Sequence, residues 1–365
     1  MVQPAEVREP LKFKPILQSK IWGGDGLYRV LRKGQPVDND VGESWELSDR
    51  EDNATVIASG SFAGQSMREL FTRHARDILG QQYSPALPCF PLLFKFIYAR
   101  EHLSVQVHPG AGSPLGEAKT ECWYILEAPP QGELILGIAG DGDPANTLAA
   151  LATSECRSVL NRVRVAAGDL LFIPAGTVHA ITAGLLLYEV QQNSDTTFRL
   201  YDWDRVDASG KPRQLHVKES GQVLDLRRHD KHKIPPLLLR RPTHDEEFRV
   251  ACAYFAVVKY SRCLGAVALA DVDRFRVLTC VRGGFEIGWD GGQILSMGLG
   301  DTVLVPASCV NAKVRETEPG SEFLASFIPD LMEEVFAPLR AAGYSDEEIR
   351  NLGGLEGLRQ PASTR

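Results

Sequence analysis

Four residues from two separate segments of the chain carry the donor atoms of a metal site. Gln106, His108 and Glu121 lie within SVQVHPGAGSPLGEAKTECWYIL, and His179 ends GDLLFIPAGTVH. Together they offer two imidazole nitrogens, one carboxylate and one amide oxygen, a mixed set that suits Zn²⁺ and that Mn²⁺, Fe²⁺ or Co²⁺ also accept. We therefore predict one divalent metal ion, held in the mouth of a small β-barrel.

Other polar residues fall on strands that are otherwise apolar. Side chains alternate between the two faces of a strand, so Ser104 shares a face with Gln106 and His108. Apolar residues surround Glu189 in LLLYEVQQ and Lys95 in LLFKFIY. A buried charge is costly unless it is paired or hydrogen-bonded. We therefore predict that each of these two residues either forms an ion pair or belongs to a functional site.

The elements that must position these residues are short strands, bounded by Gly, Pro or Asp. Many such strands at close spacing predict an antiparallel barrel or sandwich. In TFRLYDW, alternation places Arg199, Tyr201 and Trp203 on one face. The strands are expected at 92–98, 103–108, 121–126, 133–138, 169–174, 185–192, 197–203, 253–260, 274–281, 284–289 and 301–306. Helices are expected at 66–79, 144–164 and 330–343, and a short one near 217.

A degenerate repeat predicts two tandem barrels. GDTVLVPASCVN, residues 300–311, repeats the spacing of residues 168–179, but Asn311 stands in place of His179. The composition shifts between residues 205 and 247. We therefore expect a first domain at 1–215 with the metal site, and a second at 216–365 without one. The second would end in a helix and a frayed tail at 356–365.

Composition excludes several classes of protein. The net charge of −7 argues against nucleic acid, which needs clustered Lys and Arg. No apolar run is long enough for a membrane helix, and no secretory signal is visible. The seven cysteines are scattered without a C-x-x-C pair, as is typical of free thiols in a reducing compartment. We expect a cytoplasmic protein.

Several segments resemble the type I mannose-6-phosphate isomerases in their short bacterial form, which are tandem-cupin zinc enzymes. The resemblance rests on IWGG, GESWELS, FPLLFKFI, LSVQVHP, KTECWYIL, IPAGTVHAI and EVQQNSDTTFRLYDWDR. It implies a mainly β fold of two tandem cupin (jelly-roll) β-barrels with a few short helices. It also implies one Zn²⁺ per chain, bound by Gln106, His108, Glu121 and His179.

The same resemblance implies roles for further residues. Arg199, Lys119 and Glu189 match catalytic positions, and we expect substrate contacts from Lys95, Ser104, Trp22 and Glu43. The sequence departs from the family at Tyr98, at Phe198 and in the loop HPGAGS, which bears on substrate preference more than on the chemistry.

The implied reaction interconverts mannose 6-phosphate and fructose 6-phosphate by proton transfer between C1 and C2 through an enediol. Glu189 or Lys119 could carry the proton, and a lysine near Zn²⁺ would have a lowered pKa. Arg199 could clamp an oxyanion or the phosphate, for which Lys95 is a second candidate. The expected partner is a phosphorylated sugar, bound by a monomer or homodimer.

Two other functions compete with the isomerase. An iron dioxygenase of the same fold would usually use more imidazole ligands and two open positions for O₂, and Gln106 counts against it. A non-catalytic sugar-phosphate-binding cupin should have lost Lys119, Glu189, Arg199 or a metal ligand, and the sequence keeps them all.

Overall fold

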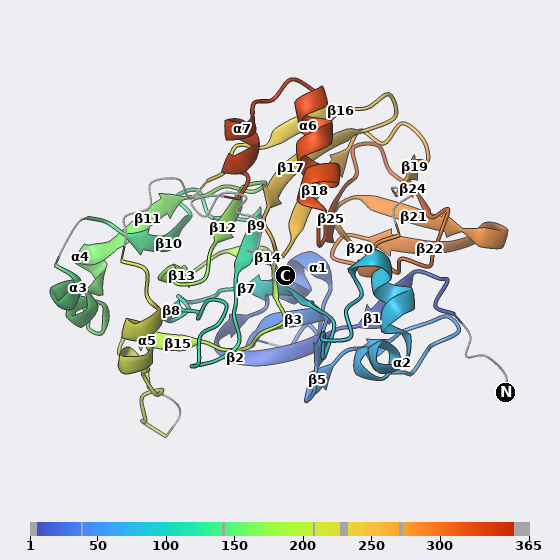
Figure 1. Ribbon diagram of the computed structural model, residues 1–365. Coiled ribbons are helices and arrows are strands. Elements are labelled where there is room, and N and C mark those ends of the chain that lie inside the picture. The colour runs from blue at the N-terminus through green and yellow to red at the C-terminus, as the bar shows by residue number, and fades with distance from the viewer. Residues whose placement is uncertain are drawn as a thin grey trace. The chain divides into compact units, whose positions relative to one another are not determined.

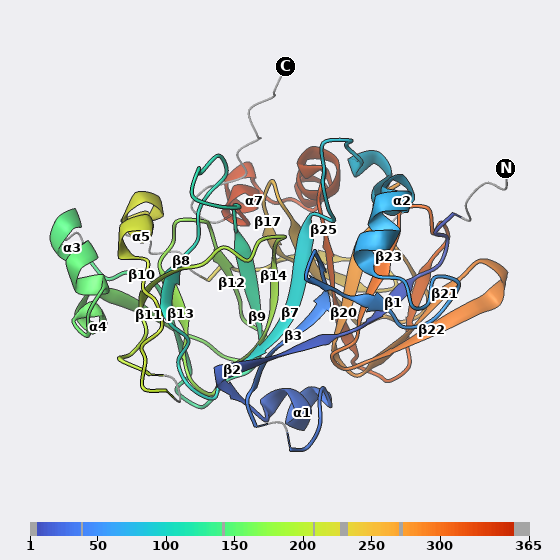
Figure 2. The ribbon, with the colours of Figure 1, turned by 90° about the horizontal axis from the view of Figure 1, so that it is seen from below.

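The computed structural model describes residues 6–37, 39–140, 143–206, 209–226, 233–269 and 273–353. The tail expected at 356–365 lies outside these residues. The described chain is mainly β with short helices (Figures 1 and 2). Among these residues, no helix has the length and apolar character needed to span a bilayer.

The chain divides into two compact units, each made of separate segments. One unit, here called the site unit, combines Leu17–Trp45 with Leu92–Lys233. The other, here called the second unit, combines Met1–Ile16, Glu46–Pro91 and Ile234–Arg365. That the chain consists of two domains, each continuous in sequence, at 1–215 and 216–365, stays a prediction.

Two antiparallel sheets build the site unit, and its core lies between them. One side of this core is formed by Ile97, Trp123 and Leu187, and the other by Leu136 and Ile181. The larger sheet has the order β12(Leu170–Ile173), β9(Glu121–Glu127), β14(Leu186–Gln192), β7(Leu92–Tyr98), β3(Val41–Leu47), β2(Ile16–Gly24). The smaller has the order β11(Leu160–Arg164), β10(Glu133–Ile138), β13(His179–Ile181), β8(Val105–Val107), β15(Phe198–Tyr201). The predicted jelly-roll packing of sheets is confirmed.

Helices cover the outer face of the smaller sheet. The segment 144–164 forms α3(Pro144–Leu151) and α4(Cys156–Val159), as expected, but its last five residues are strand β11. With α5(Val217–Val223), these helices pack on the apolar side chains of β8, β10 and β15 (Figure 1). This sheet therefore has an apolar outer face and can present polar groups on its inner face.

A bulge in β15 corrects one expectation about Arg199. The pairing of β15 with β8 shifts between Arg199 and Tyr201. The extra residue interrupts the alternation, so Tyr201 packs in the outer apolar layer with Phe198 and Leu200. The prediction that Arg199 and Tyr201 share a face is therefore wrong, and Arg199 turns inward without Tyr201.

The second unit repeats the two-sheet plan. Its sheets have the order β16(Leu237–Arg240), β17(Asp245–Ala251), β18(Ala256–Ser261), β25(Glu322–Phe327), β20(Arg276–Arg282), β23(Thr302–Val305), β1(Leu11–Lys14), β6(Val56–Ile57), and β19(Val267–Ala268), β24(Lys313–Glu316), β21(Gly284–Trp289), β22(Gln293–Gly298). The shorter elements are α1(Gly26–Leu31) in the site unit and β4(Asp49–Arg50), β5(Asn53–Ala54), α2(Met67–Leu79), η1(Gly80–Gln82), η2(Asp290–Gly292), η3(Leu331–Phe336), α6(Ala337–Ala341) and α7(Asp346–Asn351) in the second unit.

The internal repeat is visible in local geometry. Gly168 and Gly300 both have positive φ, at 89° and 84°. The carboxylates that follow them, Asp169 and Asp301, each accept a backbone N–H three residues upstream at 2.8 Å. Each turn then leads into a buried strand, β12 or β23. The two strand-and-turn units are therefore built alike.

Candidate metal centre and substrate pocket

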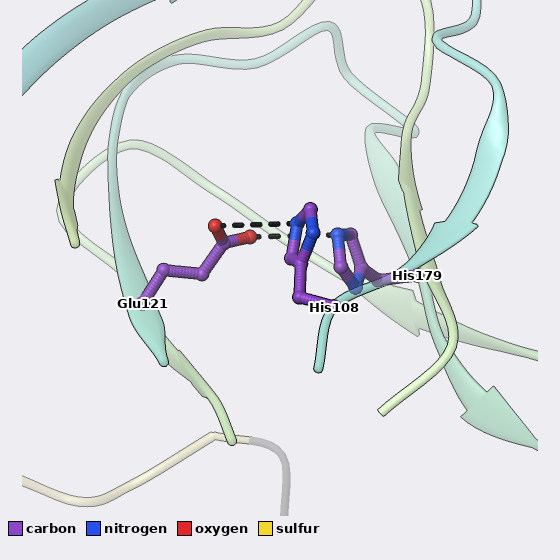
Figure 3. A group of neighbouring side chains, drawn as sticks. All are labelled: His108, Glu121 and His179. Atoms are coloured by element: carbon purple, nitrogen blue, oxygen red, sulfur yellow. Dashed lines mark ion pairs between the residues drawn. The ribbon is translucent and has the colours of Figure 1, made fainter. Parts of the chain in front are cut away.

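Three buried side chains of the site unit converge on one point. His108 follows β8, Glu121 begins β9 and His179 begins β13. Glu121 Oε2 lies 3.6 Å from His108 Nε2, and Glu121 Oε1 lies 3.4 Å from His179 Nε2. Figure 3 shows the carboxylate facing both imidazole rings. Their ligand atoms all lie within 4.8 Å of one another, close enough to hold one metal ion.

Backbone carbonyls fix both imidazoles in one tautomer. His108 Nδ1 lies 2.8 Å from the carbonyl oxygen of Thr196, and His179 Nδ1 lies 2.8 Å from that of Thr177. A carbonyl oxygen only accepts, so each Nδ1 must carry the proton and donate it. Each Nε2 therefore turns a lone pair toward Glu121, the arrangement typical of metal-binding histidines.

Burial keeps both imidazoles neutral. It lowers the pKa of His179 to about 4, and it lowers the pKa of His108 well below its ordinary range, with help from the charge of Lys119. A neutral imidazole is the form that binds a metal. The two histidines are thus in the ligand state at neutral pH.

The carboxylate of Glu121 is buried, and its charge is only partly compensated by the protein. The residue is fully buried, and neither carboxylate oxygen accepts a hydrogen bond of regular geometry among the described residues. Burial raises the pKa of Glu121 to about 7, although the nearby ammonium of Lys119 opposes this rise. A divalent cation would satisfy both oxygens, so the donor set fits a metal ion.

Gln106 borders this cluster through strand pairing. It pairs with His179 on β13 and with Arg199 on β15, so these three residues form one row across the sheet. The Gln106 amide nitrogen lies 3.2 Å from His179 Nε2, and Ser104 Oγ donates to Gln106 Oε1 at 3.4 Å. A half-turn of the amide would bring its oxygen to the histidine side.

A pocket of about 300 Å³ opens beside the cluster, entirely within the site unit. It brings together every residue predicted to be catalytic or to contact substrate. It also contains residues that the sequence reasoning missed. The lining comprises Lys20, Trp22, Glu43, Lys95, Ile97, Leu103, Ser104, Gln106, Lys119, Trp123, Ile181, Glu189, Asp195, Thr197, Arg199 and Arg213. Asp195 and Thr197 lie in the motif NSDTTFRLYDWDR and could have been found there, whereas Arg213 lies inside the turn-rich segment DRVDASGKPRQ, where no pattern marks it.

Lysines and glutamates alternate around part of the pocket. Lys95 Nζ lies 3.5 Å from Glu189 Oε2 and 3.9 Å from Glu43 Oε2, and Lys20 Nζ lies 3.6 Å from the same Glu43 oxygen. Trp123 donates to Glu189 Oε1 at 3.0 Å. Burial favours the neutral form of Glu189, but the ammonium groups of Lys119 and Lys95 outweigh it and lower the pKa of this carboxyl.

Lys119 lies between acidic and basic groups of the protein, and the lowering of its pKa expected from a bound Zn²⁺ stays a prediction. Its Nζ lies 2.9 Å from Glu121 Oε2 and 3.3 Å from His108 Nε2. Burial opposes its charge, but the carboxylates of Glu121 and Glu189 more than compensate and raise the pKa of Lys119. Within the protein's own electrostatics, Lys119 is therefore an ammonium and a proton donor.

Arginines form a second charged group. Arg199 Nη1 donates to the Gln214 carbonyl at 2.9 Å, while its buried Nε has no hydrogen-bond partner among the described residues. Arg213 Nε donates to Asp202 Oδ2 at 2.7 Å, and Arg213 Nη2 and Arg205 Nη2 both donate to Asp202 Oδ1. Burial raises the pKa of Asp202, but these arginine hydrogen bonds dominate and lower it.

Comparison with known proteins decides the family. Residues 11–138 match the catalytic domain of type I phosphomannose isomerase. The chain is 35% identical over 317 residues to the mannose-6-phosphate isomerase ManA of Bacillus subtilis, covering 82% of this chain and 93% of that protein. This chain belongs to the type I phosphomannose isomerases. A mannose-6-phosphate isomerase of Streptococcus mutans is 37% identical over 222 residues, which span 60% of this chain and 68% of that relative.

Solved structures of phosphomannose isomerases share the fold. The mannose 6-phosphate isomerase of Bacillus subtilis superposes with a TM-score of 0.78 at 27% identity, covering 87% of this chain and 99% of that one. A mannose 6-phosphate isomerase bound with zinc and yttrium superposes with a TM-score of 0.67 at 16% identity, covering 87% and 99%. The predicted phosphomannose isomerase fold is thereby confirmed.

Proposed function

We infer that this phosphomannose isomerase interconverts mannose 6-phosphate and fructose 6-phosphate. The observation that carries this inference is the buried cluster of His108, Glu121 and His179, beside a pocket lined by Gln106, Lys119 and paired acids and bases. An aldose–ketose isomerisation needs an acceptor for the C–H proton, a donor toward the sugar oxygens and an electrophile that stabilises negative charge. The pocket contains candidates for all three.

We propose that one zinc ion per chain is bound by Gln106, His108, Glu121 and His179. Support comes from the two neutral imidazoles with fixed Nδ1 protons and from a fully buried carboxylate whose one close cation among the described residues is Lys119. When bound, zinc supplies Lewis-acid polarisation of the substrate oxygens. Other divalent metals suit the same donors.

Glu189 is our proposed base for the proton that moves between C1 and C2. Its Oε1 is occupied by Trp123, and its buried Oε2 has no hydrogen-bond partner among the described residues, so Oε2 is the oxygen able to accept a proton. The lysines lower its pKa and keep it ionised. Lys119, held as an ammonium, donates toward a sugar oxygen in this scheme.

The remaining pocket residues bind and orient the sugar. Arg199 acts on negative charge of the substrate, and Ser104 and Trp22 line the wall that the sugar ring would contact. Glu43 and Lys95 hold Glu189 within their ion-pair network. The seven cysteines are all free thiols, which supports our proposal of a cytoplasmic enzyme. A monomer or homodimer remains the prediction for its assembly.

The test measures metal content and turnover on the same purified protein. We expect about one zinc per chain and conversion of mannose 6-phosphate to fructose 6-phosphate. A chelator should abolish the conversion, and added zinc should restore it. Turnover that persists after complete removal of metal would contradict the metal-dependent mechanism, and absence of conversion by the zinc-loaded protein would contradict the assigned reaction.

A further inference from the structure

The two charged groups of the pocket differ in how completely their charges are compensated. Lys95 lies between the carboxylates of Glu43 and Glu189, and Lys119 lies beside that of Glu121. By contrast, Arg199 and Arg213 line the pocket, and among the described residues Arg213 has one ion-pair partner, Asp202, while no ion pair involves Arg199.

Neutralisation of the arginine group is incomplete. Asp202 is hydrogen-bonded by both Arg213 and Arg205, so its single charge serves two guanidinium groups. Asp195 also lines the pocket, but among the described residues no ion pair joins it to either pocket arginine. Burial and the charge of Arg213 lower the pKa of Arg199, which indicates that the cations repel one another. An anionic ligand would relieve this repulsion.

The arginines also retain unused donors. Arg199 Nη1 donates a hydrogen bond to the Gln214 carbonyl, and the buried Nε has no acceptor among the described residues. The edge formed by Nε and Nη2 is therefore available to a ligand. Arg213 Nε and Nη2 donate hydrogen bonds to Asp202, which leaves Nη1 as the nitrogen available to a ligand. A buried N–H without an acceptor is costly, and in a pocket it indicates that a ligand supplies the acceptor.

We propose that Arg199 and Arg213 together bind the phosphate group of the substrate, and that Asp202 positions Arg213 for this contact. A guanidinium edge matches two phosphate oxygens, so two arginines can neutralise a dianion. Arg213 then determines specificity for phosphorylated over free sugars. The proposal deepens the proposed function and rests on it for the identity of the sugar, while phosphate binding itself can be measured separately.

The experiment compares Arg213→Ala and Arg213→Lys with wild type, using zinc-loaded protein. Binding of inorganic phosphate is measured by calorimetry, and kcat and KM are measured with mannose 6-phosphate. We expect Arg213→Ala to raise the phosphate Kd and the KM about ten- to hundredfold while kcat stays within about threefold. Arg213→Lys should recover part of the loss, because a point charge lacks the planar fork.

Arg205→Ala is the matched control. Arg205 also donates to Asp202, but it does not line the pocket, so its removal tests the same ion-pair network without the phosphate contact. We expect its phosphate Kd and KM to stay within about threefold of wild type. Asp202→Asn should weaken phosphate binding less than Arg213→Ala, because it frees Arg213 without removing its charge.

Each outcome decides a separate question. Unchanged phosphate binding in both Arg213 variants would overturn the proposal, whatever the turnover. So would a loss confined to kcat, or an equal loss in Arg205→Ala, which would assign the effect to the network. If Arg213→Ala does not fold, Arg213→Lys carries the test. Phosphate binding by a wild-type protein that converts no sugar would contradict the proposed reaction and not this site.

Discussion

At the scale of single residues, the site consists of buried polar side chains whose charges and lone pairs the protein does not fully compensate. Glu121 is fully buried with only the Lys119 ammonium beside it among the described residues, and both imidazoles are held neutral. Such groups are stabilised by a cation that they can share. Turn signals at strand ends predicted His108 and His179, and Glu121 was predicted from its place in the same segment and from the family resemblance. Sequence spacing could not predict the raised pKa of Lys119, which depends on Glu189 from the distant strand β14 as well as on the neighbouring Glu121.

Removing either imidazole should remove the metal and the activity together. His108→Ala and His179→Ala each delete one of two nitrogen ligands that the oxygens cannot replace. Zinc content by elemental analysis and turnover should both fall to background. His102→Ala is the control, since His102 is half-buried outside the cluster and should keep both. Stoichiometric zinc with normal turnover in His179→Ala would refute the ligand assignment.

Glu189→Gln should separate chemistry from metal binding. The amide keeps the shape and the Trp123 contact but cannot take a proton, so we expect kcat to fall on the order of 10²–10⁴-fold with zinc retained. Steady-state kinetics and elemental analysis check this. Glu43→Gln removes a carboxylate of the same network and should lower kcat much less. A variant as active as wild type would move the base to another residue.

Zinc affinity should depend on pH through Glu121. With its pKa raised to about 7, the carboxyl binds a proton below that pH, and zinc must displace it. The affinity should therefore fall by roughly tenfold per pH unit below 7. In zinc-stripped protein, the contribution of Glu121 to stability is present below its unfolded pKa of 4.5 and is lost as pH rises through about 7. Chelator competition at several pH values measures the first effect, and Glu121→Gln should flatten its slope.

At the scale of elements, the positions of the strands could be predicted from the sequence, but the pairing of strands within the sheets could not. The strands expected at 133–138 and 284–289 match β10 and β21 at both ends. Alternation and turn residues act locally, so they mark where a strand begins and ends. The bulge after Arg199 adds one residue through pairing with β8, and no local pattern marks it. Arg213 was missed for a similar reason, because its role arises from Asp202 on a different segment.

Helix α2 offers a test of local stability away from the pocket. Ser66 forms a capping box with Glu69, in which each side chain bonds to the backbone N–H of the other residue. Ser66→Ala should lower the free energy of unfolding by about 1 kcal/mol and leave kcat and KM unchanged. Urea unfolding provides the measurement. A change in kinetic constants without a change in stability would contradict a purely structural role for this cap.

At the scale of the whole molecule, one fold plan occurs twice, and within the described ranges one copy brings metal-binding side chains together. In the second unit, Asn311 replaces the ligand histidine of the repeat and has positive φ, at 64°. Among the described residues, His108, Glu121 and His179 form the one group of three or more His, Cys, Asp or Glu side chains close enough to hold a metal ion. Shared turn geometry is therefore insufficient for a metal site, which also needs donors on neighbouring strands.

The metal count per chain tests this difference between the units. Asn311→Ala should leave zinc at about one per chain and turnover unchanged, because the described part of the second unit has no cluster of imidazoles and carboxylates that could hold a metal. Elemental analysis of the variant and wild type is the measurement. Two zinc ions per wild-type chain, with one lost in Asn311→Ala, would overturn the single-site assignment.

The carbonyl contacts of the two imidazoles have an evolutionary consequence. His108 and His179 are oriented by main-chain oxygens of Thr196 and Thr177, and every amino acid supplies such an oxygen. Mutation at these two threonines can therefore exchange the side chain while the imidazole tautomer is inherited unchanged. The path of the backbone therefore sets the orientation of both imidazoles, and substitutions at Thr177 and Thr196 should leave that orientation in place.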